Sequence, residues 1–543
     1  MKQSTRRESG IAASTVTRLT LALVFIALVI WPLLRMFSNL TMQSVQKVFS
    51  SPAFGTAVLH SFAASGLATL ITLCIAYLLA MCMERSAMPC KGLFRVILVL
   101  PMLIPSISHG MGLILLFGNN GILTNLLHLS TSIYGFGGIV AGSVLYAFPV
   151  AFLLLDDVMR YEDCSPYEAA RVLGISKWRQ FTGITFPYLR KPLISVVFAT
   201  FTMIVTDYGV PLIVGGKYAT LPVVMYQEVI GQLDFGKGCV YGSILLIPAV
   251  VAFLFDLFNR DKGNLNFVTR SFAPDRRPLR DAVSTLWCSL VSLCTLLPIA
   301  AFVVLAFATK YPSNMAVTLK NIADTIHLGG AVYLKNAAVI ALCTALFGTL
   351  FAFCTAYLTA RMPSRLSKAL HLFAITSAAI PGIVLGLSYV LTFRKSPVYG
   401  TIMILIMVNM THFIASPYLM MYNSLQKLNG NLESVGQTLG IPRLRMIRDV
   451  FFPQCRGTLL EMFSYFFVNC MMTISAVSFL ANTVNKPISL MINQFEAQMQ
   501  LECAAVVSLA ILLVNLLLKA LIYLGRTGFD RRRAASSAAT ISS

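Results

Sequence analysis

Charged residues are scarce in this chain of 543 residues. Aspartate, glutamate, lysine and arginine together make up 12% of the sequence, whereas a soluble domain carries about 25%. Hydrophobic residues account for 57%, so the composition excludes an ordinary soluble protein and indicates an integral membrane protein. The net charge of +21 would suggest nucleic acid in a soluble protein. Here it is scattered through short loops, so we expect a lipid bilayer and no nucleic acid as its partner.

Motifs for metal binding, disulfide scaffolds and ATP binding are absent as well. The twelve cysteines include no Cys-x-x-Cys pair, and the sequence has no dense set of carboxylates or of His and Cys. No Gly-x-x-x-x-Gly-Lys-Ser/Thr phosphate loop occurs, so the chain cannot bind ATP in that manner. We therefore expect no catalytic residues, no metal site and no cofactor in this chain, and we do not expect an enzyme.

Long apolar stretches dominate the sequence instead. A membrane-spanning helix needs about 20 apolar residues, and twelve stretches qualify. Because lipid offers no partner for backbone N–H and C=O groups, each stretch is expected to be a helix. The predicted fold class is an all-α integral membrane protein with about 12 transmembrane helices. The stretches lie at approximately 18–37, 57–83, 95–118, 136–158, 192–215, 239–259, 284–309, 336–360, 369–393, 398–422, 457–481 and 502–524.

The loops between these stretches alternate in charge. One alternate set of loops, together with both termini, holds 32 of the 42 Lys and Arg residues, and the other set holds ten. Positively charged loops stay on the cytoplasmic side of a membrane. We therefore expect both termini, and the two repeated loops described next, in the cytoplasm.

Two of the basic loops repeat one pattern. Each contains Leu-Gly-Ile, then a basic helix-like run, then Phe-Pro. The glycine and the proline are equally far apart in both loops, from Gly174 to Pro187 and from Gly440 to Pro453. The separation of Gly174 from Gly440, called the loop offset below, is close to half the length of the chain. A duplication of the chain explains the match.

Each repeated loop is predicted to form two short helices joined at the glycine. The residues before Gly174 read as a short helix, and glycine can adopt the left-handed conformation that ends it. Lys177 begins a second short helix, and Pro187 falls near the first turn of the next spanning helix, where proline is tolerated. A basic loop held to anionic lipid is the alternative, but it does not explain the matched spacing.

A second echo of the duplication lies in the third apolar stretch of each half. Pro105 with Gly110 parallels Pro381 with Gly386. Pro and Gly kink a spanning helix and let neighbouring helices approach closely. A kinked helix of this kind suits a pathway wall and ordinary close packing equally well.

Polar side chains within the apolar stretches are candidates for a pathway through the membrane. An ionisable group at mid-membrane costs about 2.5–3.5 kcal/mol on insertion scales, so its presence calls for an explanation. Hydrogen bonding between helices is the alternative explanation for most of them, and a solvated position at the outer mouth is the alternative for the aspartate. The candidates are Asp207, Tyr208, His109, Asn469, Thr473 and Ser475.

The repeated loops resemble the EAA motif of permease subunits of bacterial ATP-binding-cassette (ABC) importers of the type I fold. As in that family, each loop lies between the fourth and fifth helices of a six-helix half. The resemblance implies that each loop forms a coupling helix that docks on a separate ATPase subunit. The residues that carry it are Glu168, Ala169, Ala170, Gly174 and Pro187 in the first copy and Glu433, Ser434, Gly436, Gly440 and Pro453 in the second.

The second copy departs from the motif. When the glycines are aligned, Ser434, Val435 and Gly436 stand where the first copy has Glu-Ala-Ala, and Glu433 is displaced by one position. The likeness covers nearly the whole chain and implies a fused permease with two homologous type I halves. Its partners would be two copies of an ABC ATPase subunit, which uses ATP and Mg, and an extracytoplasmic solute-binding protein. Its location would be the bacterial plasma (inner) membrane, which it crosses several times.

The expected organisation follows the duplication. A cytoplasmic N-terminus (1–17) precedes the first transmembrane domain (18–259), which contains the first EAA loop (164–190). A cytoplasmic linker (260–283) leads to the second transmembrane domain (284–525) with the second EAA loop (429–456), and a cytoplasmic tail (526–543) follows.

The solute is inferred from short phrases only. Fused permeases of this layout resemble those for ferric iron, thiamine and phosphonates. The phrase Asp-Tyr-Gly-Val-Pro from Asp207 and the phrase Thr-Ile-Ser-Ala-Val from Thr473 are most similar to 2-aminoethylphosphonate permeases. The resemblance therefore implies import of 2-aminoethylphosphonate or another phosphonate, with ferric iron or thiamine as the alternative. A twelve-helix secondary transporter predicts no paired coupling loops, and a membrane enzyme would need clustered acidic or metal-binding residues, so both are less favoured.

Overall fold

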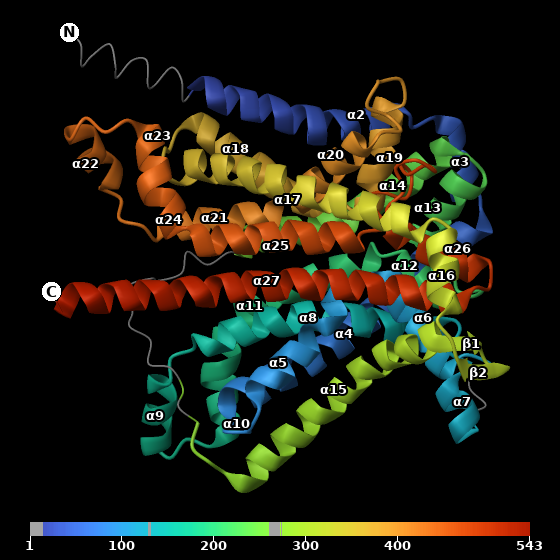
Figure 1. Ribbon diagram of the computed structural model, residues 1–543, viewed down its shortest axis with the longest axis horizontal. Helices are drawn as coiled ribbons and strands as arrows, with labels where there is room; N and C mark the ends of the chain where they lie inside the picture. Colours follow the sequence, from blue (N-terminus) through green and yellow to red (C-terminus); the bar gives the residue numbers. More distant parts are fainter. Residues whose placement is uncertain (1–14, 129–131, 260–271, 273, 543) are drawn as a thin grey trace. The chain divides into compact units, whose positions relative to one another are not determined.

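The computed structural model describes residues 15–128, 132–259, 272 and 274–542, with side chains up to residue 526. It is almost wholly helical, as Figure 1 shows. Most of the expected N-terminal segment (1–17) and about half of the expected linker (260–283) lie outside the described residues. The fold class predicted from composition, an all-α membrane protein, is confirmed.

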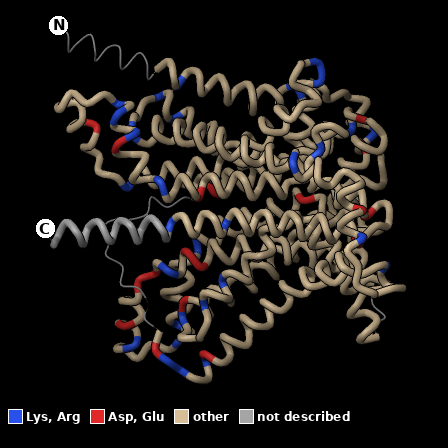
Figure 2. The backbone as a smooth tube through the Cα atoms, viewed as in Figure 1, with Lys and Arg blue, Asp and Glu red and all other residues tan. Residues whose placement is uncertain are grey.

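The chain forms two compact units. Unit 1 comprises residues 1–40, 326–491 and 510–543, and unit 2 comprises residues 41–325 and 492–509. In each unit the charged side chains gather near the helix ends, and the long middle stretches of the helices carry few (Figure 2). This distribution is expected of membrane-spanning helices, because placing an ionised group at the bilayer centre costs free energy.

The elements of unit 2 are mostly helices, with one small hairpin. Their bounds are α3 (Met42–Phe49), α4 (Pro52–Arg85), α5 (Lys91–Val99), η2 (Leu100–Leu103), α6 (Ser106–Phe117), α7 (Ile122–Leu127), α8 (Phe136–Arg160), α9 (Ser165–Val172), α10 (Lys177–Gln180), η3 (Phe181–Thr185), α11 (Phe186–Val205), α12 (Gly209–Val214), α13 (Leu221–Tyr226), η4 (Gln227–Gly231), α14 (Phe235–Asn259), α15 (Pro278–Phe307), β1 (Ala308–Lys310) and β2 (Asn314–Val317).

The elements of unit 1 begin with η1 (Ile26–Ile30) and α2 (Trp31–Ser38) and continue with α17 (Gly330–Ala360), α18 (Arg365–Thr376), η5 (Ser377–Ala379), α19 (Gly382–Phe393), α20 (Ile402–Phe413), α21 (Ala415–Gln426), α22 (Leu432–Thr438), α23 (Arg443–Met446), η6 (Ile447–Phe451), α24 (Phe452–Gln454), α25 (Arg456–Met472) and η7 (Ile488–Leu490). Three helices, α16 (Lys320–His327), α26 (Met491–Ala497) and α27 (Leu501–Ser542), have residues in both units.

Within the described part of the chain, nine helices are long and apolar enough to cross a membrane, or up to eleven if each of two bent pairs is one span. The predicted stretch at 457–481 is the one missing from these eleven, because its helix α25 has 17 residues and ends at Met472. Thr473 is extended, with φ −64° and ψ 137°. The apolar run there continues as a non-helical segment.

The kinks predicted at Pro105 and Pro381 are present as breaks between helices. Proline has no N–H, and it drives the residue before it out of the helical region. Ile104 and Ile380 accordingly have extended backbones, with φ −123° and −106°. In unit 1 the chain bends by 109° between the helices on either side of the break.

The first spanning helix of each sequence half packs among helices of the other half. The span Thr15–Ser38 belongs to unit 1, where the Arg18 guanidinium donates to the carbonyl of Met362 at 3.1 Å. Helix α15 belongs to unit 2, where the Asp281 carboxylate accepts from the N–H of Ala87 at 3.0 Å. The packed units therefore differ from the sequence halves by an exchange of first helices, and residues 492–509 of the second half also belong to unit 2.

Candidate functional site

The two repeated loops have nearly the same backbone. Helices α9 and α22 both end at a glycine with positive φ, +68° at Gly174 and +67° at Gly440. In the first loop Ile175 N–H donates to the Ala170 carbonyl at 2.9 Å, and in the second Ile441 N–H donates to the Gly436 carbonyl at 2.8 Å. This is the Schellman arrangement, so the glycine cap predicted from the sequence is confirmed in both loops.

A π-helical turn follows the second short helix of each loop, at matched positions. Elements η3 and η6 start one loop offset apart, at Phe181 and Ile447, and each runs directly into the Phe-Pro pair. Proline cannot donate to the carbonyl four residues earlier, and that residue lies within the π turn. In the first loop α10, η3 and α11 therefore run on without a break from Lys177 to Val205. The predicted short helix at Lys177 is present, and Pro187 lies in the first turn of α11 as predicted, but the short helix is continuous with the spanning helix.

Each loop exposes three apolar side chains at matched positions. The first triad is Leu173, Ile175 and Trp178, and the second triad is Leu439, Ile441 and Leu444. Pairwise in that order, their exposures are 75% and 69%, 38% and 37%, and 72% and 78%. An apolar patch that remains exposed on the surface of a protein usually marks an interaction site.

The triads were not among the candidate residues from the sequence, although the sequence holds a signal for them. Large apolar side chains recur at the loop offset within otherwise basic loops, where they have no core of their own to fill. The candidates that the sequence did provide divide by burial. Glu168, Ala169, Pro187, Ser434 and Pro453 are exposed on the loop surfaces, or nearly so, whereas Ala170 and Gly436 face inward.

The departure of the second copy from the EAA pattern has a packing explanation. A Cβ on Gly436 would collide with the sulfur of Met446. In the first copy the matched pair is Ala170 and Gln180, and the Gln180 amide donates to the Ile175 carbonyl at 2.7 Å. The second loop therefore has a glycine because a larger apolar side chain occupies the space beside it.

Glu433 is bound within the chain. Its carboxylate accepts from Arg361 Nε at 2.7 Å and from Nη2 at 2.5 Å, and its side chain is 16% exposed. The hydrogen bond to Glu433 raises the pKa of the Arg361 guanidinium. Glu433 was a candidate for contact with the ATPase on the strength of the motif, and the structure shows what holds it inside the permease.

Asp207 joins two breaks in the helices of unit 2. The Ser106 hydroxyl donates to one carboxylate oxygen at 2.6 Å, and the N–H of Val210 donates to the other at 3.0 Å. Ser106 follows the break at Pro105, and Asp207 follows the end of α11. The carboxylate thus caps the short helix α12 and ties it to α6. Tyr208, beside it, is 2% exposed and stacks on Tyr226 with ring centroids 4.9 Å apart.

In the matched region of unit 1, the break in the third helix also meets the segment that follows the fifth helix, but different side chains make the contact. We call each of these two places a crossing. Thr473 corresponds to Asp207 by the loop offset and is 8% exposed, and its carbonyl accepts from the Ser489 hydroxyl at 2.8 Å. A Cβ on Gly382, which corresponds to Ser106, would collide with the hydroxyl of Ser475. Close packing of the backbone replaces the carboxylate here.

One backbone contact is common to both crossings. A Cβ added to Gly110 would lie 3.3 Å from the carbonyl oxygen of Val210, and one added to Gly386 would lie 2.7 Å from that of Ala476. Val210 and Ala476 are themselves related by the loop offset. In each unit a glycine of the third helix therefore packs on the segment that follows the fifth helix. Irregular backbone at membrane depth is tolerated where protein buries it or where it borders a water-filled cavity.

Two further pathway candidates are placed by the same regions. His109 on α6 is 2% exposed, and its Nε2 has no hydrogen-bond partner among the described residues. The side-chain amide of Asn469 on α25 donates to the carbonyl of Tyr465, one turn earlier in the helix, at 2.8 Å. The structure therefore gathers Asp207, Tyr208 and His109 near one crossing and Asn469, Thr473 and Ser475 near the other.

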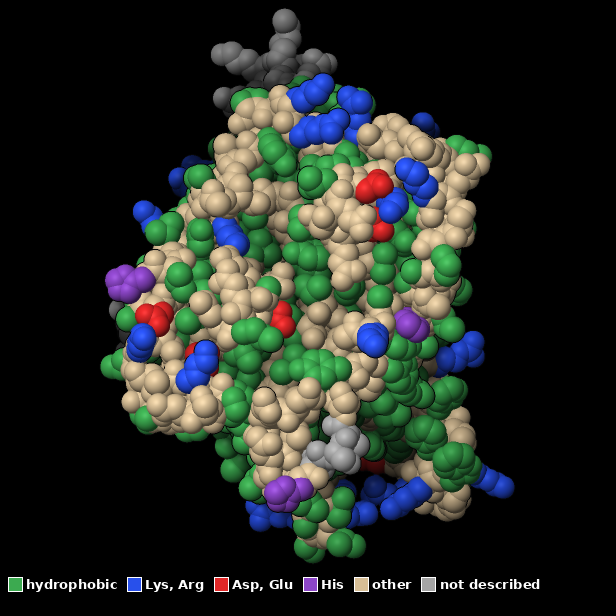
Figure 3. Space-filling view, turned by 90° about the vertical axis from the view of Figure 1, so that its right-hand side faces the viewer, with side chains coloured by type: hydrophobic (Ala, Val, Ile, Leu, Met, Phe, Trp, Pro, Cys, Tyr) green, Lys and Arg blue, Asp and Glu red, His purple; other side chains and the backbone are tan. Residues whose placement is uncertain are grey.

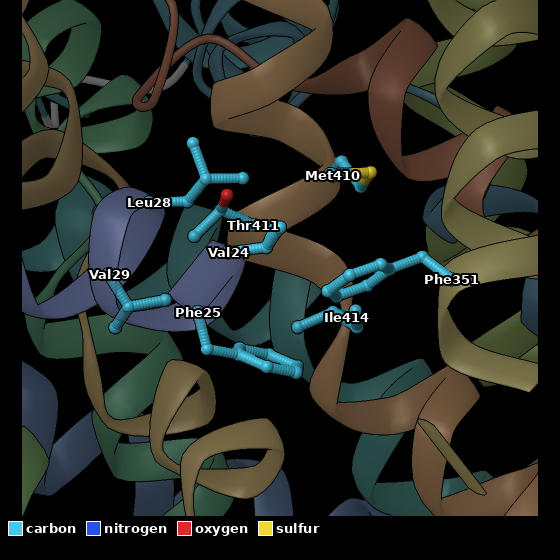
Figure 4. A pocket seen from close by; sticks show the side chains of 8 residues that line it. All are labelled: Val24, Phe25, Leu28, Val29, Phe351, Met410, Thr411 and Ile414. Atoms are coloured by element: carbon cyan, nitrogen blue, oxygen red, sulfur yellow. The ribbon is translucent and has the colours of Figure 1, made fainter. Parts of the chain in front are cut away.

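A pocket in unit 1 has no residue of either repeated loop in its lining (Figure 4). Its lining is Val24, Phe25, Leu28, Val29, Phe351, Met410, Thr411 and Ile414. The sole hydroxyl in this lining, that of Thr411, is 2.9 Å from the Tyr389 hydroxyl, which also donates to the Leu28 carbonyl in the π turn η1. The pocket is an apolar packing gap beside a π turn and offers no group suited to a polar solute.

Comparison with known proteins gives the two halves a common identity. A family model described as "Binding-protein-dependent transport system inner membrane component" matches residues 73–260 and again residues 348–529, together more than half of the chain. Each match contains one repeated loop and one crossing of broken helices. Neither match includes the first helix of a half, the element that is exchanged between the packed units.

Three relatives illustrate the range of this likeness. FbpB 1 of Haemophilus influenzae, named for ferric transport, is 25% identical over 85% of this chain and 77% of its own length. The ferric transport system permease protein FbpB of Actinobacillus pleuropneumoniae is 27% identical over 71% of this chain and 59% of its own length. The thiamine transport system permease protein ThiP of Brucella abortus is 27% identical over 27% of this chain and 28% of its own length.

Proposed function

Because the chain belongs to the family of binding-protein-dependent transport system inner membrane components, we propose that it is a permease subunit of an ATP-driven importer, with both permease halves in one chain. In this proposal the two triads are docking surfaces for two copies of one ATPase subunit, and the crossings of broken helices border the path of the solute. The family match itself supports a transport protein rather than an enzyme, and it favours an importer over a secondary transporter.

The observation that carries the proposal is the equivalence of the triads. Three exposed apolar side chains recur at matched positions with nearly equal exposure, on loops with nearly equal backbone angles. Two surfaces of one shape suit two copies of one partner. The chain has no phosphate loop of its own, so ATP hydrolysis is assigned to that partner.

For the solute we propose ferric iron. Three relatives that cover 85%, 71% and 80% of this chain are named for ferric or Fe(3+) transport. The thiamine relative aligns with 27% of the chain, which is a weaker basis. The phosphonate expectation from short phrases around Asp207 and Thr473 finds no support in these relatives. Asp207 also has a structural reason to be where it is, because it holds a helix cap.

A binding protein is part of the proposed assembly, as the family description implies. In unit 2, β1 and β2 lie at the opposite ends of the helices from α9 and α10 (Figure 1), and Figure 3 views the molecule from the side of β1 and β2. Between the groups of basic side chains at the upper and lower edges of that view, basic and acidic side chains lie scattered among neutral and apolar ones. We propose the end of unit 2 that bears β1 and β2 as part of the surface that receives the solute-loaded binding protein.

Uptake by cells with and without this gene tests the proposal. Radiolabelled ferric iron and radiolabelled 2-aminoethylphosphonate are supplied in parallel, with and without depletion of ATP. Gene-dependent iron uptake that stops on ATP depletion is expected. The double variant Trp178→Asp/Leu444→Asp should lose this uptake at an unchanged amount of protein in the membrane, because it places charge on both triads. Phosphonate uptake instead would keep the importer and overturn the cargo, and ATP-independent uptake would overturn the importer.

A further inference from the structure

Two arginines occupy matched positions at the ends of long helices. Arg85 is the last residue of α4, and Arg361 directly follows α17. Their separation along the chain equals that of Pro105 from Pro381. Arg361 is 6% exposed at its side chain and Arg85 15%. Arginines so far withdrawn from water are not explained by the general bias of cytoplasmic loops toward positive charge.

Arg361 uses all five of its N–H donors. Two go to Glu433 on α22, as described above. Nη1 donates to the carbonyls of Leu425 at 3.3 Å and Leu428 at 2.9 Å, and Nη2 donates to the carbonyl of Asn429 at 2.7 Å. An arginine has five donors in a fixed fork, so the guanidinium is saturated. It fastens the end of α21, the following turn and the coupling helix α22 to the end of α17.

The same guanidinium also reaches the π turn of the second loop. Its central carbon lies 5.3 Å from the ring centroid of Phe451, the last residue of η6, and Phe451 is fully buried. A cation over an aromatic face is attracted by the ring. Arg361 therefore contacts the coupling helix on one side of Gly440 and the π turn on the other.

Arg85 makes a corresponding set of contacts in the first loop. It pairs with Glu162, which is 2% exposed, and the Tyr167 hydroxyl donates to the same carboxylate. The Tyr167 oxygen is also 2.7 Å from the Thr185 hydroxyl in η3. Position 167 corresponds to 433, and position 185 corresponds to 451. Arg85 is thus linked to the same two loop positions as Arg361, but indirectly, through the Glu162 carboxylate and the Tyr167 hydroxyl.

The first set of contacts is less complete than the second. Arg85 Nη1 is buried and has no hydrogen-bond partner among the described residues. One face of its guanidinium lies 3.1 Å from the ring centroid of Phe272. Burial raises the pKa of Glu162, and the hydrogen bond from Tyr167 and the charge of Arg85 oppose that rise. Glu162 accepts two hydrogen bonds, as Glu433 does, but it is more deeply buried, and Arg85 donates fewer hydrogen bonds than Arg361.

From these contacts we propose that Arg85 and Arg361 are positioning residues for coupling. Each one fixes a coupling helix and its π turn to the cytoplasmic end of a second helix, α4 or α17, so that movement of a docked ATPase is passed to the spanning helices. The role in transport rests on the proposed function, whereas the mechanical anchoring does not. Because Arg361 is saturated, the second loop is the more rigidly held of the two.

The variant Arg361→Lys separates this role from a role of positive charge alone. Lysine keeps the charge but cannot form the five-bond fork. Amide hydrogen exchange is measured on the full chain in detergent, in peptides that cover α22 and α9. Exchange in α22 should rise roughly tenfold, as expected for a loosened local unit, while α9 stays unchanged. The matched control is Arg365→Lys, because Arg365 is exposed four residues further along. It should change neither peptide.

Transport provides the second measurement. If wild-type cells take up radiolabelled ferric iron, Arg361→Lys should lower the rate roughly tenfold, within the usual range of coupling between sites, while the ATPase still co-purifies through the intact triad. Unchanged exchange in α22 would overturn the anchor. Faster exchange with full iron uptake would overturn its role in coupling. Faster exchange without any uptake by the wild type would leave the anchor standing and refute the proposed function.

A milder variant guards against failure of Arg361→Lys to fold. Glu433→Gln keeps the size of the side chain and one acceptor oxygen, and should raise exchange in α22 by roughly threefold. The same substitution at Glu168, on the surface of the other coupling helix, serves as its control and should leave exchange in α9 unchanged. Equal effects of the two glutamine variants on their own helices would overturn the proposal.

Discussion

The two repeated loops have nearly the same backbone but different side chains. In both, the first short helix is capped by a left-handed glycine, the second runs into a π turn, and a triad is exposed. Beneath that surface the first loop packs Ala170 beside Gln180, whereas the second packs Gly436 beside Met446. What the two loops have in common is therefore the exposed triad and the way the loop is attached to the rest of its unit. The two packing pairs beneath the surface should therefore be exchangeable as whole pairs, whereas a single residue moved without its partner should not fit.

The two crossings of broken helices likewise share a backbone contact but differ in their side chains. Unit 2 uses an aspartate and a serine, and unit 1 uses a glycine packed on a serine, yet the glycine-to-carbonyl contact is present in both. A side chain moved from one unit to the other without its partner should therefore be harmful.

The variant Asp207→Ala should destabilise the protein by about 3 kcal/mol, because the Ser106 hydroxyl and the Val210 N–H would be left buried without an acceptor. Unfolding in denaturant, followed in detergent, measures this change. Asp207→Asn retains an acceptor oxygen and should cost less. The matched Thr473→Ala removes no carboxylate and should cost about 1 kcal/mol; an equal loss at both positions would contradict the difference between the units.

The variant Gly436→Ala should destabilise the second loop by about 2 kcal/mol, because the new Cβ collides with Met446 in a filled space. Adding Met446→Gln recreates the pair found in the first loop and should restore most of the loss. Thermal unfolding of the single and double variants measures both effects. A double variant no better than Gly436→Ala would show that the two loops do not exchange packing pairs as sets.

The variant Trp178→Ala should weaken binding of the ATPase by about 2 kcal/mol, and Leu444→Ala by about 1 kcal/mol, because tryptophan buries more apolar area and is over-represented in interface hot spots. Co-purification at graded ATPase concentrations measures both. Exposed Tyr161, in the turn after α8 and outside the triad, provides the control Tyr161→Ala. Binding unaffected by either triad variant would remove the triads from the docking surface.

The variants Gly174→Ala and Gly440→Ala should each cost about 1 kcal/mol, since an alanine at φ near +68° or +67° is strained although the space around it is open. The two costs should be equal within a few tenths of a kcal/mol, because the backbone angles agree. Thermal unfolding of each variant measures them. Unequal costs would show that the loops differ in backbone strain as well as in packing.

Much of this architecture follows from the sequence by simple physical rules. Composition and apolar length give the membrane helices, and the repeated Gly-to-Pro spacing gives the loops and their left-handed caps. The breaks at Pro105 and Pro381 follow from the missing N–H of proline. These features are local, so a local pattern is sufficient to predict them.

The remainder depends on contacts between distant residues. Nothing near Arg361 in the sequence indicates that it binds Glu433, and nothing near Asp207 indicates that Ser106 lies beside it. The exchange of first helices and the early end of α25 at Met472 are likewise set by tertiary packing. The solute inferred from short phrases differed from that of the relatives because those phrases belong to helix caps and close packing.

The most direct test of the account is the stoichiometry of the purified complex. Native mass measurement of the tagged protein, extracted in mild detergent together with its ATPase, gives the number of each chain. Two equivalent triads on one chain predict one permease chain with two copies of a single ATPase subunit. The variant Leu444→Asp should leave one copy bound, at the first triad. A complex with two permease chains, or one that keeps both ATPase copies in the variant, would contradict the account.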